Sequence, residues 1–292
     1  MKAIGHWIGG GPHEAAPERV GPVYDPALGR RTGEVALASA SDVDLAVAAA
    51  AEAFPRWRAA SLAARQRVMF RFREAVARRK DDIAALITAE HGKTLEDARG
   101  EVQRGLEVVE FACGLPHVLK GEFSEGVSKG VDMCSVRQPL GVTAGITPFN
   151  FPAMVPLWMC PIAIAAGNTF VLKPSEKVPS ASMLIAELWD EAGLPAGVFN
   201  VVQGDKAAVG RLLEHPDVRA VSFVGSTPVA RRVWEAATGR GKRVQALAGA
   251  KNHMVVLPDA DMGLAADSAV SAGYGSAAVS YTHLTLPTKR IV

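Results

Sequence analysis

The sequence has little cysteine, little net charge and no long apolar run. Its 292 residues include three cysteines, Cys113, Cys134 and Cys160, without Cys-x-x-Cys spacing or even pairing. That pattern excludes a disulfide framework and suits a reducing cytosol, so we predict a cytoplasmic location. Cys113 and Cys160 stand in apolar helical surroundings, which predicts inert core thiols.

The other absences exclude two classes of partner. A net charge of +2 gives no field suited to nucleic acid, and the cluster Arg78-Arg79-Lys80 fits a solvated helix face. No apolar run reaches the roughly 20 residues of a membrane span. The first 19 residues lack the apolar core of a signal peptide, because Gly, Pro, His and Glu interrupt it. We therefore predict no nucleic-acid partner, no membrane association and no metal site.

A hydrophobic content of 49% allows a substantial core. Helical patterns begin at Ser41, with Asp44 three residues on and an alanine-rich run to Phe54. Two more helical stretches cover residues 61–91, closed by Gly92, and about 95–114. Residues 122–138 are glycine-rich with weak alternation, which predicts a protruding two-stranded hairpin.

After Gly141 the pattern becomes strand, helix, strand at short and regular spacing. Near-continuous apolar strands alternating with helices are typical of a parallel sheet covered on both faces. The expected strands are 142–146, 169–172, 199–202, 220–224 and 244–247, with helices at 153–166, 180–192, 207–213 and 228–237. We therefore predict an α/β, doubly wound, nucleotide-binding architecture.

Two of these strands end in polar residues. The strand from Gly141 to Ile146 leads into Thr147-Pro148-Phe149-Asn150, and the next leads into Lys173-Pro174-Ser175-Glu176. Ligands of open α/β sheets bind beyond the carboxyl ends of the strands. Asn150, Lys173 and Glu176 are therefore candidate site residues.

A third strand ends in Gly225-Ser226-Thr227 and leads into a helix with Pro228 in its first turn. A glycine permits close backbone approach, and free N–H groups at a helix N-terminus bind phosphate. The same residues also make an ordinary helix cap. Together with Lys173 and Glu176 the phosphate interpretation is favoured. We expect Gly225–Thr227 at a helix N-terminus beside Lys173 and Glu176, with both segments ending adjacent parallel strands at one sheet edge.

Four motifs carry a resemblance to a known family: T-P-F-N-F-P (147–152), V-L-K-P-S-E (171–176), S-F-V-G-S-T (222–227) and A-K-N-H (250–253). From about Trp7 to Ala277 the chain resembles the aldehyde dehydrogenase superfamily, and within it the CoA-acylating methylmalonate-semialdehyde dehydrogenases. The resemblance implies an NAD-binding Rossmann-like domain at 1–121 and 139–247 and an oligomerisation hairpin at 122–138. The start of a catalytic domain would follow at 248–277. Intact family members are dimers or tetramers.

The resemblance also assigns roles. Asn150 would donate to the oxyanion formed when a thiolate attacks an aldehyde, although a plain turn asparagine is the alternative. Lys173 and Glu176 would hold the adenosine ribose and favour NAD over NADP, unless they form an exposed loop ion pair. The remaining assignments are Thr147 and Phe149 beside the nicotinamide, Lys177 at the ribose edge, Gly225 and Ser226 at the pyrophosphate, and Arg104 facing the substrate carboxylate. For Arg104 a surface helix arginine is equally consistent.

The segment Ala246-Leu247-Ala248-Gly249 matches the place where hydrolytic relatives carry Glu-Leu-Gly-Gly. Without that glutamate no general base activates water, which fits acyl transfer to coenzyme A, a thiol that needs less activation. The resemblance thus implies NAD-dependent oxidation of methylmalonate or malonate semialdehyde to propionyl-CoA or acetyl-CoA.

The likeness stops near Ala277. Tyr281 occupies the place expected for the nucleophilic cysteine, and Ser280 replaces a neighbouring arginine. Residues 278–292 continue no pattern of the preceding chain, and we interpret them as a non-native tail on a truncated gene, with a real divergent terminus as the alternative. Two alternatives to an active enzyme follow, a catalytically inactive NAD-binding fragment and a truncation that does not fold.

Overall fold

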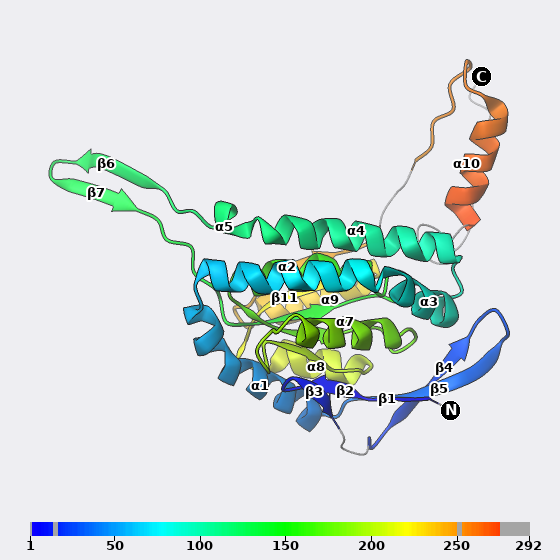
Figure 1. The fold of residues 1–292 in the computed structure, drawn as a ribbon, viewed down its shortest axis with the longest axis horizontal. Helices are drawn as coiled ribbons and strands as arrows, with labels where there is room; N and C mark the ends of the chain where they lie inside the picture. Colours follow the sequence, from blue (N-terminus) through cyan, green and yellow to red (C-terminus); the bar gives the residue numbers. More distant parts are fainter. Residues whose placement is uncertain (1, 14–16, 250–252, 275–292) are drawn as a thin grey trace.

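A seven-stranded sheet forms the centre of the molecule (Figure 1). The computed structural model describes residues 2–13, 17–249 and 253–274, so Ser280, Tyr281 and the segment 278–292 lie outside the described residues. The strand order is β12-β11-β8-β9-β10-β2-β3. The strands are β2 (His6–Ile8), β3 (Gly11–His13), β8 (Val142–Ile146), β9 (Thr169–Lys173), β10 (Phe199–Val201), β11 (Val218–Val224) and β12 (Arg243–Leu247).

The five strands from β8 to β12 run parallel, and β2 and β3 continue the sheet antiparallel. Every residue of β8 and β9 is buried, as expected for central strands covered on both faces. The predicted doubly wound α/β sheet is confirmed. Each predicted strand lies within two residues of its observed bounds.

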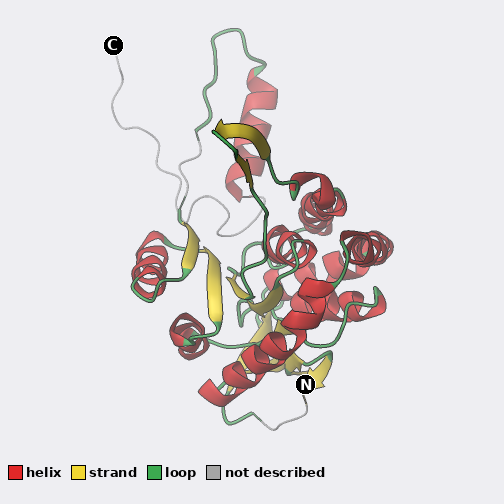
Figure 2. Cartoon of the chain, turned by 90° about the vertical axis from the view of Figure 1, so that its left-hand side faces the viewer, coloured by secondary structure: helices red, strands yellow, loops and turns green. Residues whose placement is uncertain are grey.

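Helices cover both faces of the sheet (Figure 2). On one face α6 and α7 contact the strands, and α2, α3 and α4 pack against them; on the other lie α1, α8 and α9. Phe170 and Leu172 of β9 join the first core and Val171 joins the second, because side chains alternate along a strand. The bounds are α1 (Ala40–Ala59), α2 (Leu62–Arg78), α3 (Lys80–His91), α4 (Leu95–Cys113), α6 (Met154–Ala165), α7 (Ser180–Glu191), α8 (Lys206–Glu214) and α9 (Thr227–Thr238).

The predicted N-terminal helices need two corrections. Helix α1 is capped by Ser39, whose hydroxyl accepts from the Asp42 N–H in a capping box, so the predicted start at Ser41 is wrong by two residues. The stretch 61–91 is two helices, because the chain leaves helical geometry at Arg79 (ψ 16°). Gly92 closes α3 with a φ of 86°, as predicted.

Strands before residue 41 were not predicted. A second sheet has the order β1-β5-β4, with β1 (Lys2–Ile4), β5 (Arg30–Ala36) and β4 (Val20–Asp25). The predicted hairpin is confirmed as β6 (Phe123–Ser128) and β7 (Val131–Cys134), which project from the body with every residue exposed (Figure 1). Two further helices are α5 (Leu115–Val118) and α10 (Met262–Tyr274).

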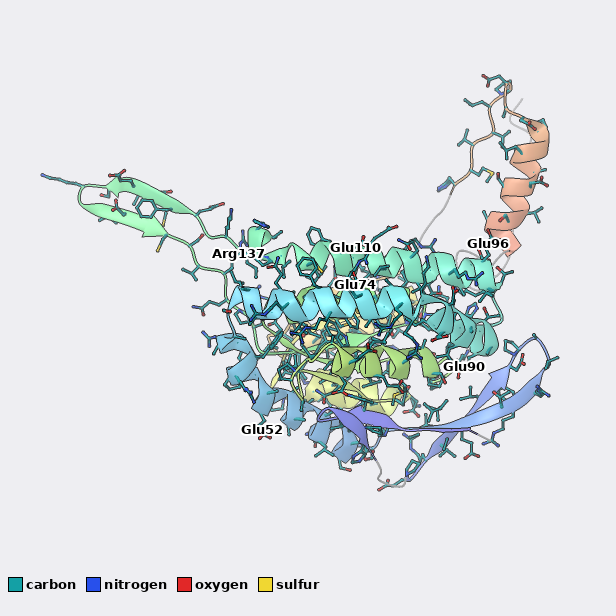
Figure 3. All side chains as sticks on the ribbon, in the orientation of Figure 1. Glu52, Glu74, Glu90, Glu96, Glu110 and Arg137 are labelled. Carbon is teal, nitrogen blue, oxygen red and sulfur yellow. The ribbon has the colours of Figure 1, made fainter. Side chains whose placement is uncertain are left out.

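Charged side chains gather on the outer surface, as Glu74, Glu110 and Arg137 illustrate (Figure 3). Cys113 and Cys160 are buried free thiols, and burial raises the pKa of both above that of free cysteine. Within the described residues no helix is long and apolar enough to cross a membrane. The same residues contain no cluster of three His, Cys, Asp or Glu side chains that could hold a metal ion.

Candidate functional site

The ends of β8 and β9 bring two of the predicted polar segments together. We call the edge at which the parallel strands β8 to β12 end the carboxyl edge. Ile146 of β8 pairs with Lys173 of β9, and the Thr147 N–H donates to the Lys173 carbonyl oxygen over 3.1 Å. The β8–α6 turn (residues 147–153) therefore begins beside the loop that carries Glu176 and Lys177.

Lys173 and Glu176 form an ion pair at this edge. The Lys173 Nζ lies 3.4 Å from Glu176 Oε2. The Lys173 side chain is 7% exposed, whereas that of Glu176 is 38% exposed. Burial lowers the pKa of Lys173, and the nearby carboxylates of Glu176 and Asp205 oppose that shift. Since the lysine is buried, the pair is not the exposed loop pair considered as the alternative.

Phe149 connects the two segments. The Lys177 Nζ lies 4.8 Å from the centre of the Phe149 ring, within the range of a cation–π contact. The His91 ring stacks on the Phe149 ring, with 6.0 Å between the two centroids. Next to these groups is a hollow of about 420 Å³, lined also by Tyr24 and Glu176. The carboxyl edge thus combines a hollow with apolar walls and a charged pair.

Gly225 and Ser226 follow β11 at the same carboxyl edge. Strand β8 lies between β11 and β9, so the expectation that the phosphate segment and Lys173 end adjacent strands is wrong. Chain order does not give spatial order in a doubly wound sheet, where crossovers skip strands. Ser226 is the N-cap residue of α9, yet its side chain makes no capping hydrogen bond. That observation disfavours an ordinary helix cap.

Arg104 lies on α4, close to the β8–α6 turn. Its guanidinium carbon is 5.7 Å from the centre of the Phe151 ring, and its Nε lies 3.3 Å from the Met154 sulfur. Arg104 is exposed, so both interpretations of this residue are compatible with its position. Arg104 lies beside the turn that carries Asn150. Its binding of the substrate carboxylate stays a prediction.

The sequence analysis did not identify two buried charged residues, Lys93 and Glu101, that contact this turn. Lys93 donates to Glu101 Oε2 and to the Asn150 carbonyl oxygen, each over 2.7 Å. Glu101 lies on the buried stripe of α4 with Ala98 and Val102. A glutamate at a core position of an amphipathic helix is the signal that would have found the pair.

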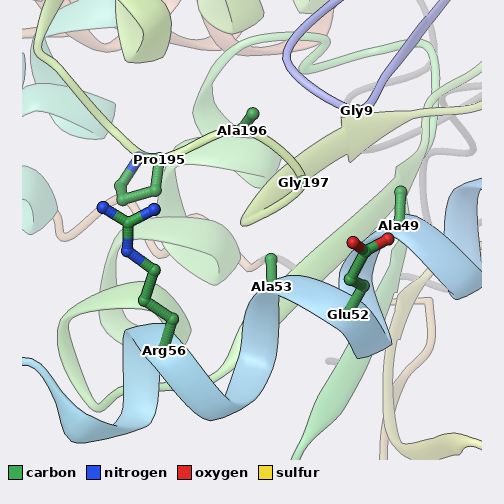
Figure 4. Close-up of a pocket in the computed structure, with 8 residues that line it drawn as sticks. All are labelled: Gly9, Ala49, Glu52, Ala53, Arg56, Pro195, Ala196 and Gly197. Carbon is green, nitrogen blue, oxygen red and sulfur yellow. The ribbon is translucent and has the colours of Figure 1, made fainter.

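A separate hollow of about 360 Å³ lies between α1 and the loop before β10 (Figure 4). Small residues line it together with Glu52 and Arg56. Because its loop, residues 195–197, leads into β10, the hollow lies at the opposite edge of the sheet from Lys173 and the β8–α6 turn. None of the predicted site residues lines it.

Three comparisons place this arrangement among known proteins. Malonate-semialdehyde dehydrogenase of Pseudomonas aeruginosa is 56% identical over 254 residues, which are 87% of this chain and 51% of that protein. A crystal structure of methylmalonate-semialdehyde dehydrogenase from Oceanimonas doudoroffii superposes with a TM-score of 0.91 at 53% identity. A second crystal structure, from Sinorhizobium meliloti 1021, is of a protein described as a methylmalonate-semialdehyde dehydrogenase in complex with NAD. It superposes with a TM-score of 0.91 at 51% sequence identity.

Each of the two structures matches 94% of this chain and 56% of its own chain. The chain thus spans about half the length of the relatives it matches. The sequence profile of the aldehyde dehydrogenase family matches residues 13–278. Since the match covers most of the chain, the protein belongs to the aldehyde dehydrogenase family.

Proposed function

We propose that this chain is the NAD-binding part of a CoA-acylating dehydrogenase that oxidises malonate or methylmalonate semialdehyde. The buried Lys173 paired with Glu176 at the carboxyl edge carries the proposal, because an ammonium and a carboxylate side by side suit the two hydroxyls of a ribose. The names of the relatives and the NAD complex of the Sinorhizobium protein support it.

The residues at the carboxyl edge fit this cofactor. The Lys173 ammonium has three donor hydrogens, and its ion-pair partner among the described residues is Glu176 at 3.4 Å. The Thr147 hydroxyl oxygen is buried and has no hydrogen-bond partner within the described part of the chain. Lys177 would lie along the ribose edge. Gly225 and Ser226, at the start of α9, would face the pyrophosphate.

The chain's own residues would serve the reaction in three ways. The Asn150 side-chain amide would donate to the oxyanion that develops when a thiolate adds to the aldehyde. Arg104 would bind the substrate carboxylate through its planar guanidinium. Thr147 and Phe149 would hold the nicotinamide end, and bound NAD supplies the hydride acceptor. Residues 246–249 lack a glutamate to activate water, which supports coenzyme A as the acyl acceptor.

Calorimetric titration with NAD and NADP tests the cofactor assignment. The wild-type chain should prefer NAD, because the Glu176 carboxylate accepts from the ribose 2′-hydroxyl and repels a 2′-phosphate. Glu176→Gln should reduce that preference by about 5- to 150-fold, corresponding to about 1–3 kcal/mol for a partly exposed charge pair. Glu187→Gln, an exposed change on α7, is the control. Equal or tighter NADP binding by the wild type would overturn the assignment.

A second candidate function is NAD binding without catalysis. It is favoured by Tyr281, which stands where the family pattern places the nucleophilic cysteine. The hairpin supports assembly of the whole protein into a homo-oligomer, because Phe123 and Met133 on it are 68% and 60% exposed.

A further inference from the structure

The Lys93–Glu101 pair is the most deeply buried ion pair among the described residues. The two side chains are 1% and 0% exposed, with Nζ and Oε2 2.7 Å apart. Removing two charges from water is expensive, and their mutual attraction often fails to offset it. Burial of the pair is therefore weak evidence that it serves only to stabilise the fold. Its hydrogen bonds to other residues indicate what else it does.

Within the described part of the chain, the other side-chain hydrogen bonds of the pair go to the β8–α6 turn and to Met154, the first residue of α6. Lys93 donates to the Asn150 carbonyl oxygen over 2.7 Å, and its Nζ lies 4.5 Å from the centre of the Phe151 ring. Glu101 Oε1 accepts from the N–H groups of Ala153 and Met154, at 2.9 and 3.1 Å. The pair thus contacts the turn at its middle and at the end where α6 begins.

The turn provides no side-chain cap for α6. Ala153 is the N-cap residue of α6 and has no side chain that could accept from the first N–H groups. Glu101 supplies that acceptor from α4. Because Lys93 fixes the peptide after Asn150, it also fixes the backbone from which the Asn150 amide projects.

We propose that Lys93 and Glu101 are positioning residues, which hold Asn150 and its turn in the geometry that receives the nicotinamide end of the dinucleotide. This inference rests on the proposed function. Lys173 and Glu176 serve the adenosine end from another loop, so the two ends of the ligand depend on different supports. Loss of the buried pair should weaken binding of the nicotinamide end alone.

The test compares NAD with ADP-ribose, which lacks the nicotinamide. The main variant is Lys93→Met/Glu101→Gln, because it leaves no buried charge without a counter-charge and keeps an acceptor for the α6 N–H groups. We expect its Kd for NAD to rise about tenfold, because without the pair the turn would populate its binding-competent geometry only about a tenth of the time. Its Kd for ADP-ribose should change less than twofold. Lys93→Gln/Glu101→Gln, which also leaves no unpaired buried charge and keeps a donor at position 93, should give a smaller change in the same direction and serves if the first double variant does not fold.

The matched control is Lys80→Met. Lys80 also hydrogen-bonds to a side chain of α4, that of Gln103 over 2.8 Å, and it has no hydrogen bond to the turn within the described residues. The control should leave both Kd values unchanged. If NAD and ADP-ribose binding weaken by the same factor in the main variant, the pair has a structural role only and the inference is wrong.

A spectroscopic readout separates this inference from the proposed function. With ¹⁵N-asparagine labelling, the Asn150 side-chain amide signal, assigned through Asn150→Asp, should shift in the double variant. The signals of Asn168 and Asn200 should stay in place. A wild-type chain that binds neither ligand would overturn the proposed function, whereas an unmoved Asn150 signal would overturn the positioning role whether or not NAD binds.

Discussion

Lys173 is a buried lysine at a position where stability alone would favour an apolar side chain. Its charge is removed from water, and its partner Glu176 lies 3.4 Å away and is partly exposed. Such groups persist where a ligand needs them. The residue therefore links the energetics of the fold to the proposed cofactor site.

Replacing Lys173 by Met should separate stability from binding. The variant should keep its free energy of unfolding within about 1 kcal/mol of the wild type or gain slightly, because the buried charge is lost and Glu176 still reaches water. NAD affinity should fall about tenfold or more. Urea unfolding and calorimetry measure the two quantities, and unchanged NAD affinity would contradict the role given to Lys173.

His6 gives the fold a dependence on pH. It is 5% exposed, and its Nδ1 accepts from the Gln203 N–H over 3.1 Å. Burial lowers the pKa of His6 from the ordinary value of 6.5, and Asp42 opposes that shift. As the pH falls below 6.5, the unfolded chain takes up a proton that folded His6 resists, so stability is lost from there down to the folded pKa. Burial lowers the pKa of His215 in the same direction.

His6→Gln should flatten part of this dependence, because glutamine keeps an acceptor and does not titrate. We expect the wild type to lose more free energy of unfolding between pH 7.5 and pH 5 than the variant. The slope that remains in the variant should come from His215 and the carboxylates. Identical losses in urea titrations of both proteins would show that His6 does not couple folding to protonation.

The sequence identified individual residues of the candidate site only where polar side chains directly follow apolar strands. Asn150, Lys173, Glu176 and Ser226 stand out in the sequence for that reason, and the structure puts all four at the carboxyl edge. Their roles stay predictions. Lys93 and Glu101 lie in helical sequence before the sheet, and their meeting with the turn depends on how α4 packs on α6.

At the scale of the elements, capping decides where α1 begins. Ser39 and Asp42 satisfy each other's backbone N–H groups. Ser39→Ala should lower the free energy of unfolding by about 1 kcal/mol. Ser41→Ala, one position inside the helix, should change it by a few tenths at most or raise it slightly, since alanine favours helix. Thermal unfolding that ranks the two variants in the opposite order would restore the Ser41 start.

The elements after Gly141 were predicted well because each strand is a short apolar run between clear helical periods. Among the missed N-terminal strands, β1, β2 and β3 are three residues each, too short for a period of two to show. The break at Arg79 carries no Gly or Pro signal. The place of β8 between β9 and β11 follows from the crossovers, which local sequence does not encode.

At the scale of the whole molecule, the chain as written should not oxidise semialdehydes. Burial raises the pKa of Cys113 and Cys160, which disfavours the reactive thiolate of both. Cys134 lies on the exposed hairpin, away from the carboxyl edge. Purified chain should produce no NADH from methylmalonate semialdehyde and CoA. The full-length Pseudomonas relative is the control. Turnover that disappears on mutating Cys160 or Cys113 would prove the prediction wrong.

Three statements about the whole molecule stay predictions. They are the domain limits at residues 121, 139 and 247, the homo-oligomer built through the hairpin, and the cytoplasmic location. The domain limits fall within one continuous chain. The homo-oligomer would form between two or more copies of it. The third depends on cysteine usage alone.

A crystal structure of this chain grown with NAD tests the central claim most directly. We predict the adenosine ribose hydroxyls on the Lys173 Nζ and the Glu176 carboxylate, and the pyrophosphate at Gly225 and Ser226. The nicotinamide should lie next to Thr147 and Phe149. NAD bound at the opposite edge of the sheet, in the hollow beside Arg56, or not at all at saturating concentration would contradict the account.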